Sequence, residues 1–167
     1  MSWRTSSASP LDRLFACLPY VLPMLEALPF GTELLSEFPM LQPLLLPLYP
    51  FAIAYSFVTG IFSFGGFGIG GFLIFLAMYF FVVRNESISH FIRFNTMQSI
   101  LIGIVLSLFS LVLSPIIRAL PPLFLQSILT ALFLGTFIAC IYAIVQSALG
   151  RYAEIPTLSD AAHIQVR

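Results

Sequence analysis

The sequence predicts an all-α integral membrane protein: a polytopic bundle of four transmembrane helices plus an interfacial or re-entrant segment. Hydrophobic residues make up 59% of the 167 residues and charged residues 8%, and the mean hydropathy is +1.02. A soluble domain is about a quarter charged, and a single core of this size could not bury so much apolar surface. The apolar runs are long and do not alternate, which favours helices over a barrel in lipid.

The first apolar stretch, residues 14–30, follows a short polar lead over residues 1–10. It contains three prolines and one acidic residue, and we predict a kinked helix inside the bundle. Proline is tolerated in a spanning helix when neighbouring helices satisfy the freed backbone groups. The lead shows neither a cleavable signal nor a transit peptide, so we expect the chain to begin almost at its first membrane segment.

Three further stretches are free of charge and long enough to cross a bilayer. Residues 66–83 provide about 27 Å of helix at 1.5 Å per residue, just enough for a hydrocarbon core of about 30 Å. Residues 95–117 and 122–149 follow, with Arg118 between them. The stretch 40–64 is apolar enough to insert, but prolines break up its first half.

The arginines discriminate between four and five crossings. With four, six of the seven arginines lie on the side of both termini and Arg118 lies alone on the other. The positive-inside rule favours this uneven distribution. We therefore predict four crossings, both termini on the cytoplasmic or stromal side, and residues 33–64 on the far side. The membrane domain covers residues 11–149 and a polar tail covers residues 150–167.

The sequence predicts no cofactor, metal or nucleic-acid site. The string from Gly66 to Gly71 has the glycine spacing of dinucleotide-binding loops, but it opens an apolar helix without the strand and acid that such loops need. His90 and His163 stand apart from other metal-binding residue types, and no nucleophile, base and orienting acid occur together. The net charge is zero, without a basic patch for nucleic acid. We expect a protein that is not an enzyme.

A candidate polar face of the bundle consists of Arg93, Asn95, Gln98 and Glu26. Arg93 should lie at the membrane interface, with Asn95 and Gln98 one helical turn apart just inside it. Amides need partners once they leave water, so both should face the bundle, either as anchors and caps or as a functional surface. Glu26 either reaches the headgroups or faces a polar cavity.

A candidate helix-packing face lies on the last crossing, where small residues recur at every fourth position: Ala131, Gly135, Ala139, Ala143 and Ser147. Small residues in a row let two helix backbones approach closely in a membrane. We expect this row to pack against other helices of the same chain, which we favour over packing against a second copy. A homo-oligomer would use the same chemistry.

Several short strings together resemble one family. They are Leu18-Pro19-Tyr20 with Pro23, Phe38-Pro39, Val83-Arg84-Asn85, Arg93-Phe94-Asn95 with Met97-Gln98, and Asp160-Ala161-Ala162. They extend over nearly the whole chain, and the string that begins at Arg93 is the most specific. The chain resembles the twenty-kilodalton subunit of the translocon at the inner envelope membrane of chloroplasts, in its cyanobacterial or plastid-encoded type.

The resemblance implies a four-helix membrane subunit of a precursor-import complex that contributes to a polypeptide passage. It implies as partners other translocon membrane subunits and the translocating polypeptide. The lipid bilayer is predicted from the composition, and the small-residue row leaves a homo-oligomer open. The membrane would be the plastid inner envelope, or a cyanobacterial plasma or thylakoid membrane. The family has no catalytic residues to carry over, although Arg93, Asn95 and Gln98 match its signature.

Two alternatives stay open at this point. One is a structural or assembly membrane protein that packs in a larger complex. The other is a small-solute transporter, which the short chain and its few intramembrane charges disfavour.

Overall fold

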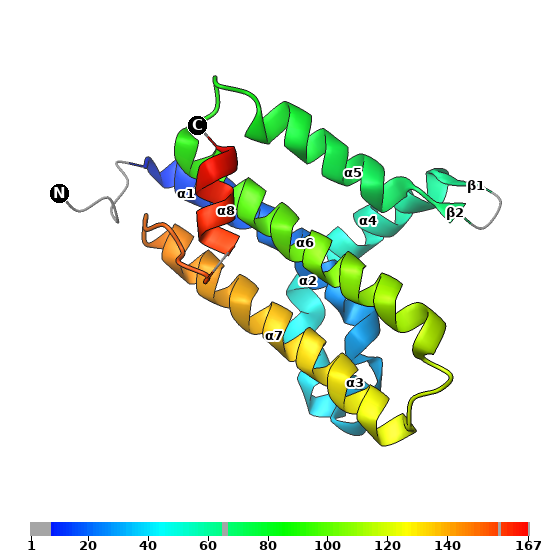
Figure 1. Cartoon of the computed structure of the whole chain (residues 1–167). Helices are drawn as coiled ribbons and strands as arrows, with labels where there is room; N and C mark the ends of the chain where they lie inside the picture. Colours follow the sequence, from blue (N-terminus) through cyan, green and yellow to red (C-terminus); the bar gives the residue numbers. More distant parts are fainter. Residues whose placement is uncertain (1–7, 65–66, 157, 167) are drawn as a thin grey trace.

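The computed structural model describes residues 8–64, 67–156 and 158–166, and in these ranges the chain is a helical bundle with one short β-hairpin (Figure 1). The helical segments are α1 (Pro10–Cys17), η1 (Leu18–Tyr20), α2 (Val21–Ala27), η2 (Leu28–Gly31), α3 (Thr32–Glu37), η3 (Pro39–Leu48), α4 (Tyr49–Ile61), α5 (Gly70–Met78), η4 (Tyr79–Val83), α6 (His90–Ile116), α7 (Pro122–Ala148) and α8 (Leu158–Gln165). The hairpin pairs β1 (Ser63–Phe64) with β2 (Phe67–Gly68). The predicted all-α membrane class is confirmed.

Residues 10–37 form one long, kinked helix, which we call the rod. Ser9 begins it with a capping box: its hydroxyl accepts from the backbone N–H of Asp12 at 3.1 Å, and the Asp12 carboxylate accepts from the N–H of Ser9 at 3.0 Å. Proline cannot donate a backbone hydrogen bond, and tighter 3-10 turns form around Pro19 and Pro29. The rod therefore bends without ending.

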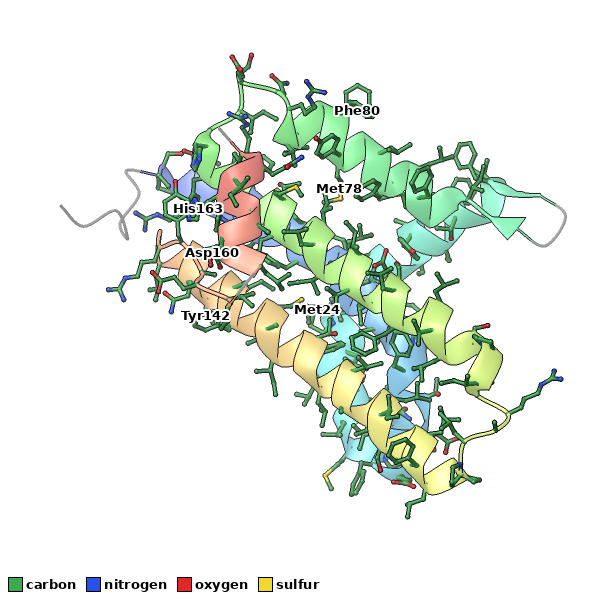
Figure 2. The ribbon with its side chains drawn as sticks, in the orientation of Figure 1. Met24, Met78, Phe80, Tyr142, Asp160 and His163 are labelled. Atoms are coloured by element: carbon green, nitrogen blue, oxygen red, sulfur yellow. The ribbon has the colours of Figure 1, made fainter. Side chains whose placement is uncertain are left out.

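The rod packs between α6 and α7, two long antiparallel helices. Tyr20 and Met24 of the rod share a buried cluster with Ile102 of α6 and Cys140 of α7. In Figure 2, Met24 lies between the ribbons of α6 and α7. These three long helices enclose the core, and the other segments are added around them.

The first and last described residues lie at the same end of the bundle, which we call the tail end because it holds α8 (Figure 1). Gly150 ends α7 there with a φ of 73°. A residue that follows a helix commonly adopts this left-handed conformation, which glycine accepts without strain. The side chain of Arg13 covers Gly150, so the start of the rod lies beside the end of α7.

Residues 39–83 bring the chain back from the far end of the bundle to the tail end. Glu37 lies at the far end, where Gln126 of α7 donates to its carboxylate at 2.9 Å. Val83 lies at the tail end, where its carbonyl accepts from Nε of Arg93 at 2.8 Å. Because the rod, α6 and α7 each run the length of the bundle, the chain passes along it four times in all.

The helices able to cross a membrane differ in two places from those expected. By length and hydropathy, four helices in the described ranges qualify: Pro10–Glu37, Pro39–Ile61, His90–Ile116 and Pro122–Ala148. Their number agrees with the prediction. Pro39–Ile61, which was expected as part of an interfacial or re-entrant segment, is long and apolar enough to span. The helix expected over residues 66–83 begins at Gly70 and is too short to qualify. The hairpin takes up part of that stretch. Gly70 then lies so close to Thr59 that an added Cβ would be 2.5 Å from the Thr59 Cα.

We predict that cysteines at positions 87 and 119 react from opposite faces of the membrane. Ser87 is exposed in the loop before α6 at the tail end, and Ala119 is exposed in the loop after α6 at the far end. The variants Ser87→Cys and Ala119→Cys, made after alanine replaces Cys17 and Cys140, would be treated with an impermeant maleimide in sealed, oriented vesicles. One should react before lysis and the other only after it. Labelling of both from the same face would contradict the four passes.

Candidate functional site

Five polar side chains are buried together near the tail end and form what we call the polar cluster: Tyr20 of η1, Asn95 and Gln98 of α6, Ser147 of α7 and Ser159 of α8. Four of them are fully buried and Ser159 is 8% exposed. A buried polar group without a partner costs about 2–7 kcal/mol in an apolar environment. The hydrogen bonds of these groups therefore constrain how the helices are placed.

Asn95 accepts hydrogen bonds from two other helical segments. The Tyr20 hydroxyl lies 2.9 Å from Oδ1 of Asn95 and 2.6 Å from Oε1 of Gln98. The Ser147 hydroxyl donates to the same Asn95 oxygen at 2.7 Å. Nδ2 of Asn95 donates to the carbonyl of Phe91, one turn back in α6, at 2.8 Å. The rod, α6 and α7 are thus joined through one amide.

Gln98 connects α6 to the C-terminal tail. Its Nε2 donates to the carbonyl of Ala153 at 3.1 Å and to Oγ of Ser159 at 2.9 Å. The Ser159 hydroxyl donates in turn to the Ala153 carbonyl at 3.0 Å and accepts from the N–H of Ile155 at 2.7 Å. The Gln98 amide group therefore has partners on both its oxygen and its nitrogen.

A third polar residue of α6, Ser99, donates a hydrogen bond to a backbone carbonyl of the rod beside a proline. Pro23 has no N–H, so the α-helical hydrogen bond to the carbonyl of Pro19 cannot form. The hydroxyl of Ser99 donates to that carbonyl at 2.6 Å. α6 thus supplies a side-chain donor to a carbonyl that the proline leaves without its α-helical partner.

Aromatic rings cover the polar cluster at the tail end. His163 of α8 (Figure 2) packs on Phe94 of α6 with ring centroids 4.4 Å apart, and Tyr152 packs on Phe94 at 5.0 Å. Nδ1 of His90 lies 3.1 Å from the Tyr152 hydroxyl, and its Nε2 lies 3.3 Å from the carbonyl of Val166. Burial raises the pKa of the Tyr152 phenol above its usual value. Both histidines thus have packing partners, and no group of three metal-binding residue types occurs among the described residues.

The structure separates the four residues of the candidate polar face. Asn95 and Gln98 lie in the polar cluster. Arg93 lies outside it, half-buried, where its Nε donates to the carbonyl of Val83 at the end of η4. Glu26 faces a cleft on another side of the bundle. Sequence analysis did not identify Tyr20 and Ser159 as members of the cluster.

The cleft has a volume of about 860 Å³ and opens between the rod, α4, α5 and α6. The π-helical turn η4 packs on α6, whereas α5 diverges from α6 toward the hairpin, so the two helices form a V (Figure 1). In Figure 2, Met78 lies between α5 and α6 near the narrow part of the V. The cleft thus lies on the side of α6 from which α5 diverges.

One wall of the cleft carries a row of small and hydroxyl residues on α6, which we call the serine row: Ser99, Gly103, Ser107, Ser110 and Ser114. Residues three or four positions apart share one face of a helix. The spacing is visible in the sequence, but sequence analysis did not single it out. Hydropathy treats a serine within an apolar run as a small interruption, and the pattern has meaning only once α5 is seen to leave this face uncovered.

Glu26 lies directly against the serine row. An added Cβ at Gly103 would be 2.9 Å from Oε2 of Glu26, so glycine leaves room for the carboxylate beside α6. Tyr55 of α4 lines the same cleft, and its hydroxyl would be 3.2 Å from a Cβ at Gly71 of α5. The cleft thus presents a carboxylate, a phenol and serine hydroxyls between largely apolar walls.

The candidate helix-packing face divides along its length. Ser147 belongs to the polar cluster, Ala143 is fully buried and Ala139 is half-buried. Ala131 and Gly135 are exposed, and a Cβ added at Gly135 would meet no atom within 4 Å. Within this chain, the row is in the core only toward the tail end.

The chain matches known proteins over nearly its whole length. The family model described as "Chloroplast import apparatus Tic20-like" matches residues 6–162. A Tic20 family protein of Synechocystis sp. is 47% identical over 97% of each chain. The Tic20 family protein Ycf60 of Gracilaria tenuistipitata is 34% identical over 93% of this chain and 76% of its own. The Arabidopsis thaliana protein TIC 20-v, chloroplastic, is 30% identical over 96% of this chain and 73% of its own.

We predict that Gln98→Leu destabilises the fold by about 1–3 kcal/mol, because the Tyr20 hydroxyl and the Ala153 carbonyl both lose a partner. The measurement is the free energy of unfolding in detergent, together with the rate of tryptic cleavage after Arg151, which should rise as the tail is released. Ser107→Ala is the matched control and should change stability by less than about 0.5 kcal/mol. A Gln98→Leu protein as stable and as protease-resistant as the control would contradict this role.

We also predict opposite outcomes for leucine at two positions of the small-residue row. Ala143→Leu should cost about 1–3 kcal/mol, because the larger side chain overpacks a filled core. Gly135→Leu should not destabilise the isolated chain and should stabilise it by up to about 1 kcal/mol, since the site is open and leucine favours the helix more than glycine does. Both are measured by unfolding in detergent. Equal losses at the two positions would show that the whole row is packed.

Proposed function

The chain belongs to the Tic20-like family of the chloroplast import apparatus, in the type found in cyanobacteria, and on this basis we propose that it is a membrane subunit of a protein-translocation complex. The observation that carries the proposal is the family match over residues 6–162. That range includes the rod, both long helices, the polar cluster and the cleft. Relatives named as chloroplastic proteins of Arabidopsis thaliana match across the same bundle.

The packing of the bundle supports a passage formed at its surface. Between the rod, α6 and α7 the space is filled by buried side chains such as Met24, Leu106 and Phe133. A polypeptide could not pass through that core without separating it. The cleft between α5 and α6 offers the alternative: one wall of a passage, which a partner subunit or a second copy would complete.

The distribution of arginines supports an orientation in the membrane. Four described arginines belong to segments at the tail end: Arg13, Arg84, Arg93 and Arg151. Arg118 lies in the loop at the far end. By the positive-inside rule the tail end faces the cytoplasm or, in a plastid, the stroma. The membrane would be the plastid inner envelope, or a cyanobacterial plasma or thylakoid membrane.

A second candidate function is that of an assembly subunit. Such a subunit binds other membrane proteins without contacting the translocating polypeptide, which we call the passenger. The exposed part of the small-residue row favours it, because Ala131 and Gly135 leave a surface on which another helix can pack closely. Both candidates predict contacts with other membrane subunits. Contact with a translocating polypeptide distinguishes them.

The test is photo-crosslinking to a polypeptide arrested during translocation. A photo-reactive residue would be placed singly at exposed positions around the bundle: Phe57 on α4, Ser110 on α6 and Ile138 on α7. We expect adducts with the passenger from at least one of these positions and not from all three, because the passage should lie along one side of the bundle. Adducts with other membrane subunits alone, while translocation is shown to be active, would favour the assembly function instead.

A further inference from the structure

The cleft differs from the surrounding lipid-facing surface in the hydrogen-bonding groups that it exposes. Ser107, Ser110 and Ser114 line it, and no hydrogen bond to their hydroxyls forms among the described residues. By contrast, Ser56 and Ser127 donate to carbonyls of their own helices at 2.9 Å and 2.8 Å. The three cleft hydroxyls are therefore free to bond to an occupant.

The three hydroxyls lie along one line on α6, within reach of a short extended peptide that runs beside the helix. The three hydroxyls run from Ser107 to Ser114, about 10.5 Å along α6 at 1.5 Å per residue. The rest of the serine row adds none, because the Ser99 hydroxyl donates to the Pro19 carbonyl and Gly103 has no side chain. In an extended chain, backbone groups that face one side recur every second residue, about 6.6–6.8 Å apart. About three extended residues span the three hydroxyls, and about six or seven span the whole serine row. A lipid acyl chain would also fill the cleft, but it has no group that bonds to hydroxyls.

A carboxylate lies beside the row without a cation. Glu26 touches Gly103, the second member of the row, and no arginine forms a salt bridge with it within the described ranges. A carboxylate among apolar walls is costly, and a cation carried by an occupant would reduce that cost. The side chains of arginine and lysine are long enough to reach Glu26 from a backbone lying along α6.

We propose that this cleft binds an extended segment of the translocating polypeptide and that Glu26 favours segments that carry arginine or lysine. The inference rests on the proposed function and adds to it a binding site, a bound conformation and a charge preference. The serine hydroxyls bond to the passenger backbone irrespective of its sequence. Glu26 supplies the selectivity, and Gly103 provides the space in which its carboxylate lies.

The experiment compares two arrested passengers in membranes that contain the complete complex. The passengers are identical except that one carries arginines and the other glutamines in the arrested segment, and the photo-reactive residue stands at Ser110. We expect a roughly fivefold higher adduct yield for the arginine passenger, the upper range for a partly solvated ion pair. Glu26→Gln should remove this preference and keep the adduct with the glutamine passenger. Glu33→Gln, an exposed acid on α3 outside the cleft, should leave the preference unchanged.

Each other result overturns a different part of the account. Equal yields for the two passengers, with adducts at Ser110, would retain the cleft as a peptide site and reject the role of Glu26. Adducts at Ser110 with phospholipid alone, while Phe57 or Ile138 still reaches the passenger, would reject the cleft site and leave the proposed function standing. Passenger adducts at none of the three positions would reject both. The thermal midpoint of Glu26→Gln, measured in parallel, shows whether that isosteric variant is folded.

Discussion

A membrane interior offers no hydrogen-bond partners from solvent, and the arrangement of this bundle depends on where its buried amides find theirs. Asn95 and Gln98 lie at the start of α6 and between them bond to the rod, to α7 and to the tail. The prolines of the rod fit the same scheme. They free a backbone carbonyl at Pro19, and Ser99 of α6 supplies the donor. The tail end is therefore fixed by directional bonds in addition to packing.

The opposite part of the bundle has no comparable network among the described residues. η4 packs on α6, with the Arg93 guanidinium on the carbonyl of Val83, but beyond that point α5 leaves α6 and its apolar surface meets the cleft. This asymmetry suits a subunit that must stay assembled while it offers a surface to a changing partner. Apolar walls with scattered hydroxyls bind a peptide backbone weakly and without sequence preference. In the proposed site, the carboxylate of Glu26 would add one point of selection.

Composition alone was sufficient to predict the class, because an 8% charged chain of this hydropathy has no soluble alternative. The cost of removing amides from water gave the physical reason to expect Asn95 and Gln98 inside the bundle. It could not identify Tyr20 as their partner, because Tyr20 lies 75 residues from Asn95 in the chain. Hydropathy also gave a wrong start for the helix predicted over residues 66–83. It does not distinguish an apolar hairpin from an apolar helix, and the helix begins only at Gly70. The cleft was beyond prediction, since it results from the divergence of α5 and α6, which no local pattern encodes.

We expect the tail end, which directional hydrogen bonds hold together, to keep its geometry while the distance across the cleft changes when a passenger binds there. Pulsed electron resonance between spin-label pairs tests this expectation directly, with one pair across the cleft at Ile69 and Val112 and one across the tail end at Ser87 and Ile164, all exposed positions. With an arrested passenger, the distance distribution of the first pair should change and that of the second should stay the same. Distributions that change at the tail end, or that stay the same across the cleft, would contradict this expectation.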